Sequence, residues 1–139
     1  MNSISFLAFI LVYTKRYVFY NHFFVFSRKN RNFVANKETM PKIFEYFGFI
    51  FYFYSNEHEP IHVHVIHGGK ESIFDIIMMN GALAGISVRE KKGAEPLTEK
   101  DKRTAEDFIR KYHKNIIEKW VKFFVLKQSV RSTSIKKKL

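Results

Sequence analysis

Hydrophobic and polar residues alternate strictly along IHVHVIH, residues 61–67. Successive side chains of a β-strand point to opposite faces of its sheet, so this alternation predicts a strand. His62 and His64 then share one face, and Val63 and Val65 share the other. We expect the valines to face a core and the histidines to lie on the opposite face.

Three further stretches have the composition of strands. Residues 43–54 read IFEYFGFIFYFY, residues 71–78 read ESIFDIIM, and residues 83–90 read LAGISVRE. Gly48 lies inside the first stretch, which indicates a β-bulge or a close backbone approach. Turn signals separate the four strands and predict an antiparallel meander; they are residues 55–60, Gly68–Gly69 and Asn80–Gly81.

Residues 98–126 predict a long α-helix. Thr98 is a favourable N-cap, and Asp101 stands at the capping-box position. Apolar residues recur at spacings of three and four, as on one face of a helix. They are Ala105, Phe108, Ile109, Tyr112, Ile116, Trp120 and Phe124. Residues 129–139 are interpreted as either a frayed tail or a short last strand.

Together these elements predict an α+β domain in which an antiparallel four-stranded β-meander packs against a long C-terminal α-helix. The domain is placed at residues 40–127, and residues 128–139 form a basic C-terminal tail. Residues 1–39 are a separate N-terminal extension. Their apolar run is too short to span a bilayer and lacks the order of charges found in a signal peptide.

The extension has two interpretations. The sequence MPKIFEYFG from Met40 is typical of a natural protein start, which favours a mis-assigned start upstream of it. The competing interpretation is a hydrophobic arm that associates with a membrane. For residues 40–139 no membrane segment is expected.

Composition and charge limit the kinds of functional site that the chain can hold. The chain lacks cysteine, which excludes disulfides, thiolate catalysis and cysteine–zinc sites and is compatible with a reducing cytoplasm. The formal net charge is +11. The basic surplus lies in residues 1–39 and 127–139, whereas residues 40–126 are nearly neutral. Such flanks fit contact with RNA or an acidic partner, or simply solvated termini.

Four of the six histidines fall within residues 58–67. His62 and His64 would lie about 6–7 Å apart along the strand, close enough to share a divalent metal ion. His58 is the candidate third ligand, and Glu57 or Glu59 could add an oxygen. Glu71 and Asp75 are candidate supporting partners on the next strand.

The same three histidines, His58, His62 and His64, also suit acid/base catalysis without a metal. Nearby cations would then hold the phosphates of an RNA substrate; the candidates are Lys70, Arg89, Lys136, Lys137 and Lys138. A third interpretation is structural, because the polar face of a strand often carries histidines that simply bond to neighbours.

Four motifs of the chain belong together. They are Met40-Pro-x-Ile43, Phe47-Gly48, Asn56-Glu57-His58-Glu59-Pro60-Ile61-His62-Val63-His64 and Gly68-Gly69. In these motifs the chain resembles the bacterial domain-of-unknown-function family 4160. The resemblance covers about residues 40–126. Glu57 stands where the family usually has Asp, and Ile61 stands where it has a second Pro. His58, His62 and His64 match their family positions.

This resemblance implies a small bacterial cytoplasmic protein without a settled activity. It also implies a small cognate partner protein encoded nearby, as in a toxin–antitoxin pair. Three functional hypotheses therefore remain open. They are a toxin-like component acting on RNA through its histidine cluster, a non-catalytic protein-binding module, and a domain that binds a divalent metal.

Overall fold

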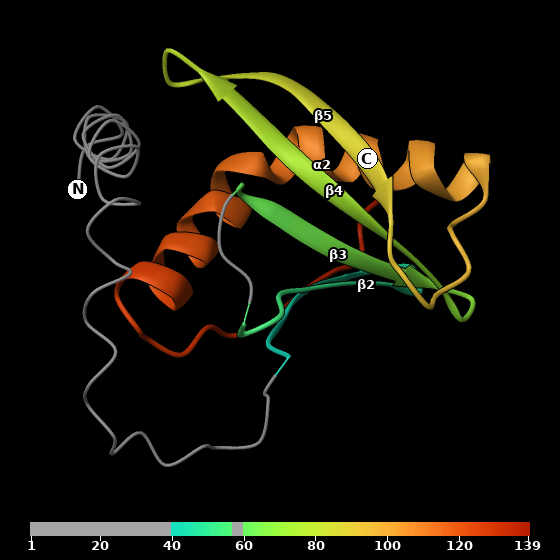
Figure 1. The fold of residues 1–139 in the computed structure, drawn as a ribbon, viewed down its shortest axis with the longest axis horizontal. Coiled ribbons are helices and arrows are strands. Elements are labelled where there is room, and N and C mark those ends of the chain that lie inside the picture. The colour runs from blue at the N-terminus through green and yellow to red at the C-terminus, as the bar shows by residue number, and fades with distance from the viewer. Residues whose placement is uncertain (1–39, 57–59) are drawn as a thin grey trace.

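The computed structural model describes residues 40–56 and 60–139, which form one sheet and one long helical segment (Figure 1). The strands are β1 (Lys42–Tyr46), β2 (Phe49–Tyr52), β3 (His62–His67), β4 (Lys70–Met79), β5 (Ala82–Glu90) and β6 (Thr133–Ile135). The helical segment is α2 (Glu99–Trp120), which continues as the π-helical turn η2 (Val121–Val125).

The order of strands in the sheet is β5-β4-β3-β2-β1-β6. Neighbours from β1 to β5 are antiparallel, as the short turns predict, whereas β6 runs parallel to β1. The α+β class is thus confirmed. The prediction of four antiparallel strands holds only in part, because the sheet formed by the described residues is mixed and has six strands.

One correction concerns residues 43–54, which form two strands rather than one. Phe47 and Gly48 have backbone φ angles of 42° and 85°. Two successive positive φ angles reverse the chain in the tight turn that suits a two-residue hairpin. Gly48 adopts this conformation without a steric penalty, so it marks a turn between β1 and β2.

The C-terminal segment follows the second of its two interpretations, because it contains a short last strand. Thr133–Ile135 pairs with Phe44–Tyr46 in parallel register and extends the sheet past β1. Lys119 on α2 donates to the Arg131 carbonyl and, at 3.3 Å, to the Thr133 hydroxyl. A short polar sequence thereby becomes a strand through contacts with residues far away in the chain.

The helix covers one face of the sheet, as Figure 1 shows. Thr98 is the N-cap, and its hydroxyl accepts the Asp101 backbone N–H at 3.2 Å. Val63 and Val65 are fully buried on this side together with Phe108 and Ile109, as expected for the apolar face of β3. Within the described residues, no helix combines the length and the apolar character that crossing a membrane demands.

Candidate functional site

The face of the sheet opposite α2 carries the site. Tyr52 on β2 lies opposite His64 on β3, and His62 lies opposite Asp75 on β4. Glu71 alternates with the core-facing Ser72 and Phe74, so it belongs to the same face as His62 and His64. The strand pattern thus gathers two carboxylates and two imidazoles over the middle of the sheet.

His64 is fixed by Glu71. Its Nδ1 lies 2.9 Å from the Glu71 Oε1, and the His64 side chain is 1% exposed. An ionised carboxylate only accepts hydrogen bonds, so Nδ1 is the donor in this pair. In a neutral His64 ring, Nε2 therefore carries the lone pair.

The backbone fixes the orientation of the His62 ring through the same ring nitrogen. Its Nδ1 lies 2.6 Å from the Pro60 carbonyl oxygen, which can only accept. The centroids of the His62 and His64 rings are 5.5 Å apart. The two rings are therefore neighbours, and each is oriented by a bond at its Nδ1.

Glu71 is the centre of a hydrogen-bond network. Besides His64, its carboxylate accepts the Tyr52 hydroxyl and, at 2.9 Å, the Lys91 ammonium. Lys91 also donates to the Tyr54 hydroxyl and lies 4.4 Å from the centre of that ring. The network thus links β2, β3 and β4 with the loop that follows β5.

The charge states of this network follow from its contacts. Burial acts to raise the pKa of Glu71, but the hydrogen bonds from Tyr52, Lys91 and His64 hold that pKa below its usual value. Burial of Tyr52, together with its hydrogen bond to Glu71, raises the pKa of the phenol. At neutral pH, Glu71 is therefore an anion and Tyr52 a neutral donor.

The predicted phosphate-holding residues divide into separate groups. Arg89 on β5 forms two hydrogen bonds to Asp75, of 3.0 and 2.8 Å, and its side chain is 46% exposed. Since Asp75 lies opposite His62, the structure brings Arg89 next to the histidine pair. Lys70 points to the α2 side and pairs with Glu95 at 2.6 Å.

The C-terminal lysines lie farther from the histidines. Lys136, Lys137 and Lys138 follow β6, and β6 is three strands from β3 in the sheet. At about 4.8 Å per strand this separation is about 14 Å. A small ligand cannot bridge it, whereas an extended polymer can.

The remaining described histidines belong to other surroundings. His67 lies on the α2 side, where its ring stacks on Phe49 with 4.0 Å between centroids and its Nδ1 lies 3.3 Å from the Asp101 carboxylate. His113 on α2 donates to the Arg110 carbonyl. The sequence cluster is thus divided by the two faces of the sheet.

A metal site requires more ligands than the two imidazoles. Within residues 40–56 and 60–139, no three His, Cys, Asp or Glu side chains are grouped to hold a metal ion. His58, the predicted third ligand, lies outside the described residues, together with Glu57 and Glu59. Hydrogen bonds from Nδ1 to a carboxylate or a carbonyl are nevertheless the usual support of metal-binding histidines.

Sequence reasoning missed Tyr52, Tyr54 and Lys91 as members of the site. Tyr54 follows Tyr52, the last residue of β2, by two positions, and this spacing is the signal that could have indicated a shared face. Every position from 49 to 54 is aromatic or isoleucine, so the polar hydroxyls do not stand out. Lys91 comes from a loop 20 residues after Glu71, and only the folded sheet brings it there.

The chain, including this site, matches one family of known proteins. The protein-family model described as "Domain of unknown function (DUF4160)" matches residues 48–121, just over half of the chain. The chain belongs to this family. The DUF4160 match begins at the β1–β2 turn and ends where α2 passes into η2, so it contains His62, His64 and Glu71.

Membership in the DUF4160 family confirms the resemblance noted in the sequence and assigns no activity. No curated protein matches the chain, and no solved structure does.

Proposed function

We propose that this protein acts on RNA, with His62 and His64 as an acid/base pair, and that it is one component of a toxin–antitoxin-like pair. The observation that carries the proposal is the matched orientation of the two rings. Each Nδ1 donates to a fixed acceptor, and the ring centroids are 5.5 Å apart. Such a pair suits a reaction in which one proton is taken and another is given.

RNA offers a reaction of this kind because it carries its own nucleophile. One imidazole Nε2 takes the proton of a 2′-hydroxyl, whose oxygen attacks the adjacent phosphorus. The other ring, protonated, gives its Nε2 proton to the departing 5′-oxygen. The products are a 2′,3′-cyclic phosphate and a 5′-hydroxyl end, and no metal or water enters this step.

Charge near the histidines supports an anionic substrate. Arg89 lies beside His62 on the same face, and its half-exposed guanidinium, which contacts Asp75, places a positive charge of the kind that binds phosphate next to the histidines. His58 remains a predicted third member of the set, outside the described residues.

The direct test is cleavage of end-labelled single-stranded RNA by the full chain, with EDTA and with added Zn²⁺. We expect cleavage with cyclic phosphate ends that is unaffected by EDTA and that falls about 100-fold or more in His62→Ala. His113→Ala, which removes the histidine on α2, is the matched control and keeps activity. Loss of activity in EDTA would move the proposal to a metal-assisted reaction, and unchanged cleavage by His62→Ala would reject it.

A second candidate function is a non-catalytic module that binds a partner protein. It is favoured by the complete burial of His64 and by the hydrogen bonds that Glu71 accepts from Tyr52, His64 and Lys91, features that also stabilise a fold. Induction of the full chain in a bacterium separates the candidates. Growth arrest that His62→Ala relieves at equal protein level supports catalysis. Capture of the neighbouring gene's product, without arrest and without RNA loss, supports the binding module.

A further inference from the structure

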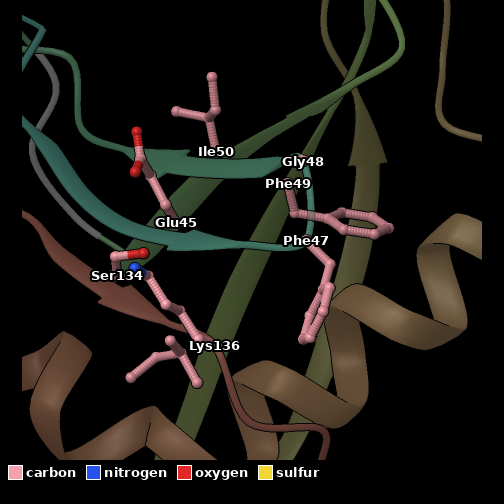
Figure 2. Close-up of a pocket in the computed structure, with 8 residues that line it drawn as sticks. Glu45, Phe47, Gly48, Phe49, Ile50, Ser134 and Lys136 are labelled. Atoms are coloured by element: carbon pink, nitrogen blue, oxygen red, sulfur yellow. The ribbon is translucent and has the colours of Figure 1, made fainter.

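A pocket of about 540 Å³ lies beside the β1–β2 turn and β6. Figure 2 shows Phe47 at the turn, with Glu45 and Ile50 on the two strands of the hairpin. Ser134 and Lys136 complete the pocket from β6 and the residue that follows it. The pocket therefore combines an aromatic ring, a hydroxyl, a carboxylate and a cation.

The strand pairings place the polar residues Glu45 and Ser134 of this pocket on the same face of the sheet as the histidines. Phe49 and Ile135, which also line the pocket, belong to the α2 side. Ile50 pairs with Ile66, and Tyr52, two residues further along β2, pairs with His64. Ile50 and His64 are thus diagonal neighbours on one face, about 7–8 Å apart. Glu45 pairs with both Ile50 and Ser134, which extends the same face to β6.

Phe47 is held in an unfavourable position. It has a φ of 42°, in the left-handed region where a bulky side chain is strained, and the residue is 55% exposed. Asn, Asp or Gly is the usual residue at this position of a hairpin turn. Strain of this kind clusters at sites that bind ligands, and an exposed ring offers a surface on which a base can stack.

The charged residues of the pocket differ in their partners. Glu45 accepts a hydrogen bond from Lys42. Lys136 forms no ion pair with any residue in the described ranges, in contrast to Lys70 and Arg89. Lys137 and Lys138 directly follow it and add two positive charges. The β6 side of the pocket is therefore the side suited to a phosphate.

We propose that this pocket binds one nucleotide of a single-stranded RNA, next to the nucleotide that reaches the histidines. The base stacks on Phe47, Lys136 contacts the phosphate, and the Glu45 carboxylate and the Ser134 hydroxyl bond the ribose hydroxyls. The choice of RNA as the ligand rests on the proposed function. The pocket would explain how the C-terminal lysines, which lie far from the histidines, contact the same RNA. The 2′-hydroxyl contact predicts tighter binding of RNA than of DNA with the same sequence.

The test is the fluorescence anisotropy of a labelled single-stranded RNA hexamer titrated with the full chain. Phe47→Ala should weaken binding about 5- to 150-fold, the range found for loss of one stacked base. Lys136→Met should weaken binding and reduce the salt dependence by about one phosphate contact. Lys114→Met, on the exposed side of α2, removes the same charge outside the pocket and should leave the salt dependence unchanged.

The outcomes separate this inference from the proposed function. Weaker binding by Phe47→Ala and Lys136→Met supports the pocket, even if the chain cuts no RNA. Cleavage of RNA with hexamer binding that neither variant changes overturns the pocket alone. Failure of the wild-type chain to bind the hexamer overturns the pocket as well.

Discussion

The Nδ1 of His64 lies 2.9 Å from the Oε1 of Glu71, across the pairing of β3 with β4. The same carboxylate receives hydrogen bonds from Tyr52 and Lys91, so one side chain sets the orientation of His64 and neutralises a partly buried lysine. The stability of the sheet and the geometry of the candidate site therefore depend on the same group.

Glu71→Gln should lower the free energy of unfolding by about 1–3 kcal/mol, because it removes a charge that three buried or partly buried donors use. Urea unfolding followed by circular dichroism measures the change. Glu95→Gln is the matched control, since the Glu95 side chain is 69% exposed in its pair with Lys70. Its effect should stay below about 0.5 kcal/mol. Equal stability of the two variants would contradict the central place of Glu71.

The free energy of unfolding should depend on pH through the protonation of Glu71. Its folded pKa lies below its unfolded value of about 4.3, so the unfolded chain binds protons first as the pH falls. The contribution of Glu71 is therefore complete above the unfolded pKa and is lost as the pH falls through the folded pKa.

Urea unfolding between about pH 7 and pH 3 tests this sign. The wild type should lose stability more steeply than Glu71→Gln below about pH 4.3. Asp101, whose pKa is lowered by bonds from Thr98 and His67 against the effect of burial, contributes in the same direction to both proteins. Parallel curves for the two proteins would show that Glu71 is not linked to folding.

Phe47→Asn should stabilise the protein by about 0.5–1 kcal/mol while weakening RNA binding. Asn tolerates the positive φ angle of the turn better than Phe does, and it removes a hydrophobic ring that is 55% exposed. Thermal unfolding and the anisotropy titration would be measured on the same preparation. A less stable Phe47→Asn protein would show that the ring supports the fold rather than a ligand.

Phe108→Ala should destabilise the domain by about 3–5 kcal/mol, because Phe108 is fully buried and packs against four aromatic rings. Its ring neighbours are Phe44, Tyr46, Phe51 and Tyr112. Leu126→Ala, at a position 47% exposed, is the control and should change the free energy of unfolding little. A small effect of Phe108→Ala in urea unfolding would contradict the packing of α2 on the sheet.

The sequence predicts the parts of this fold that depend on local pattern. Alternation along residues 61–67 places His62, His64, Val63 and Val65 on the correct faces, and the spacing after Thr98 predicts α2. The break at Gly48 is misinterpreted because aromatic residues on both sides hide the reversal of the chain. The strand β6 depends on pairing with β1, about 90 residues earlier, which no local pattern reveals.

Some residues of the candidate site are also predictable from local pattern, and others are not. His62 and His64 are predictable from their alternation, and Glu71 from the strand that follows. Tyr52 and Lys91 reach the site only through the pairing of β2 with β3 and through the loop after β5. His67 lies on the opposite face of the sheet from His62 and His64, because it directly follows Ile66, which shares their face.

The most direct measurement is cleavage of single-stranded RNA by the full chain beside His62→Ala and His113→Ala, each shown by circular dichroism to be folded. We expect cyclic phosphate ends from the wild type and from His113→Ala, and a loss of about 100-fold or more in His62→Ala. Cleavage by a folded His62→Ala at the wild-type rate, or none by the wild type, would contradict this expectation.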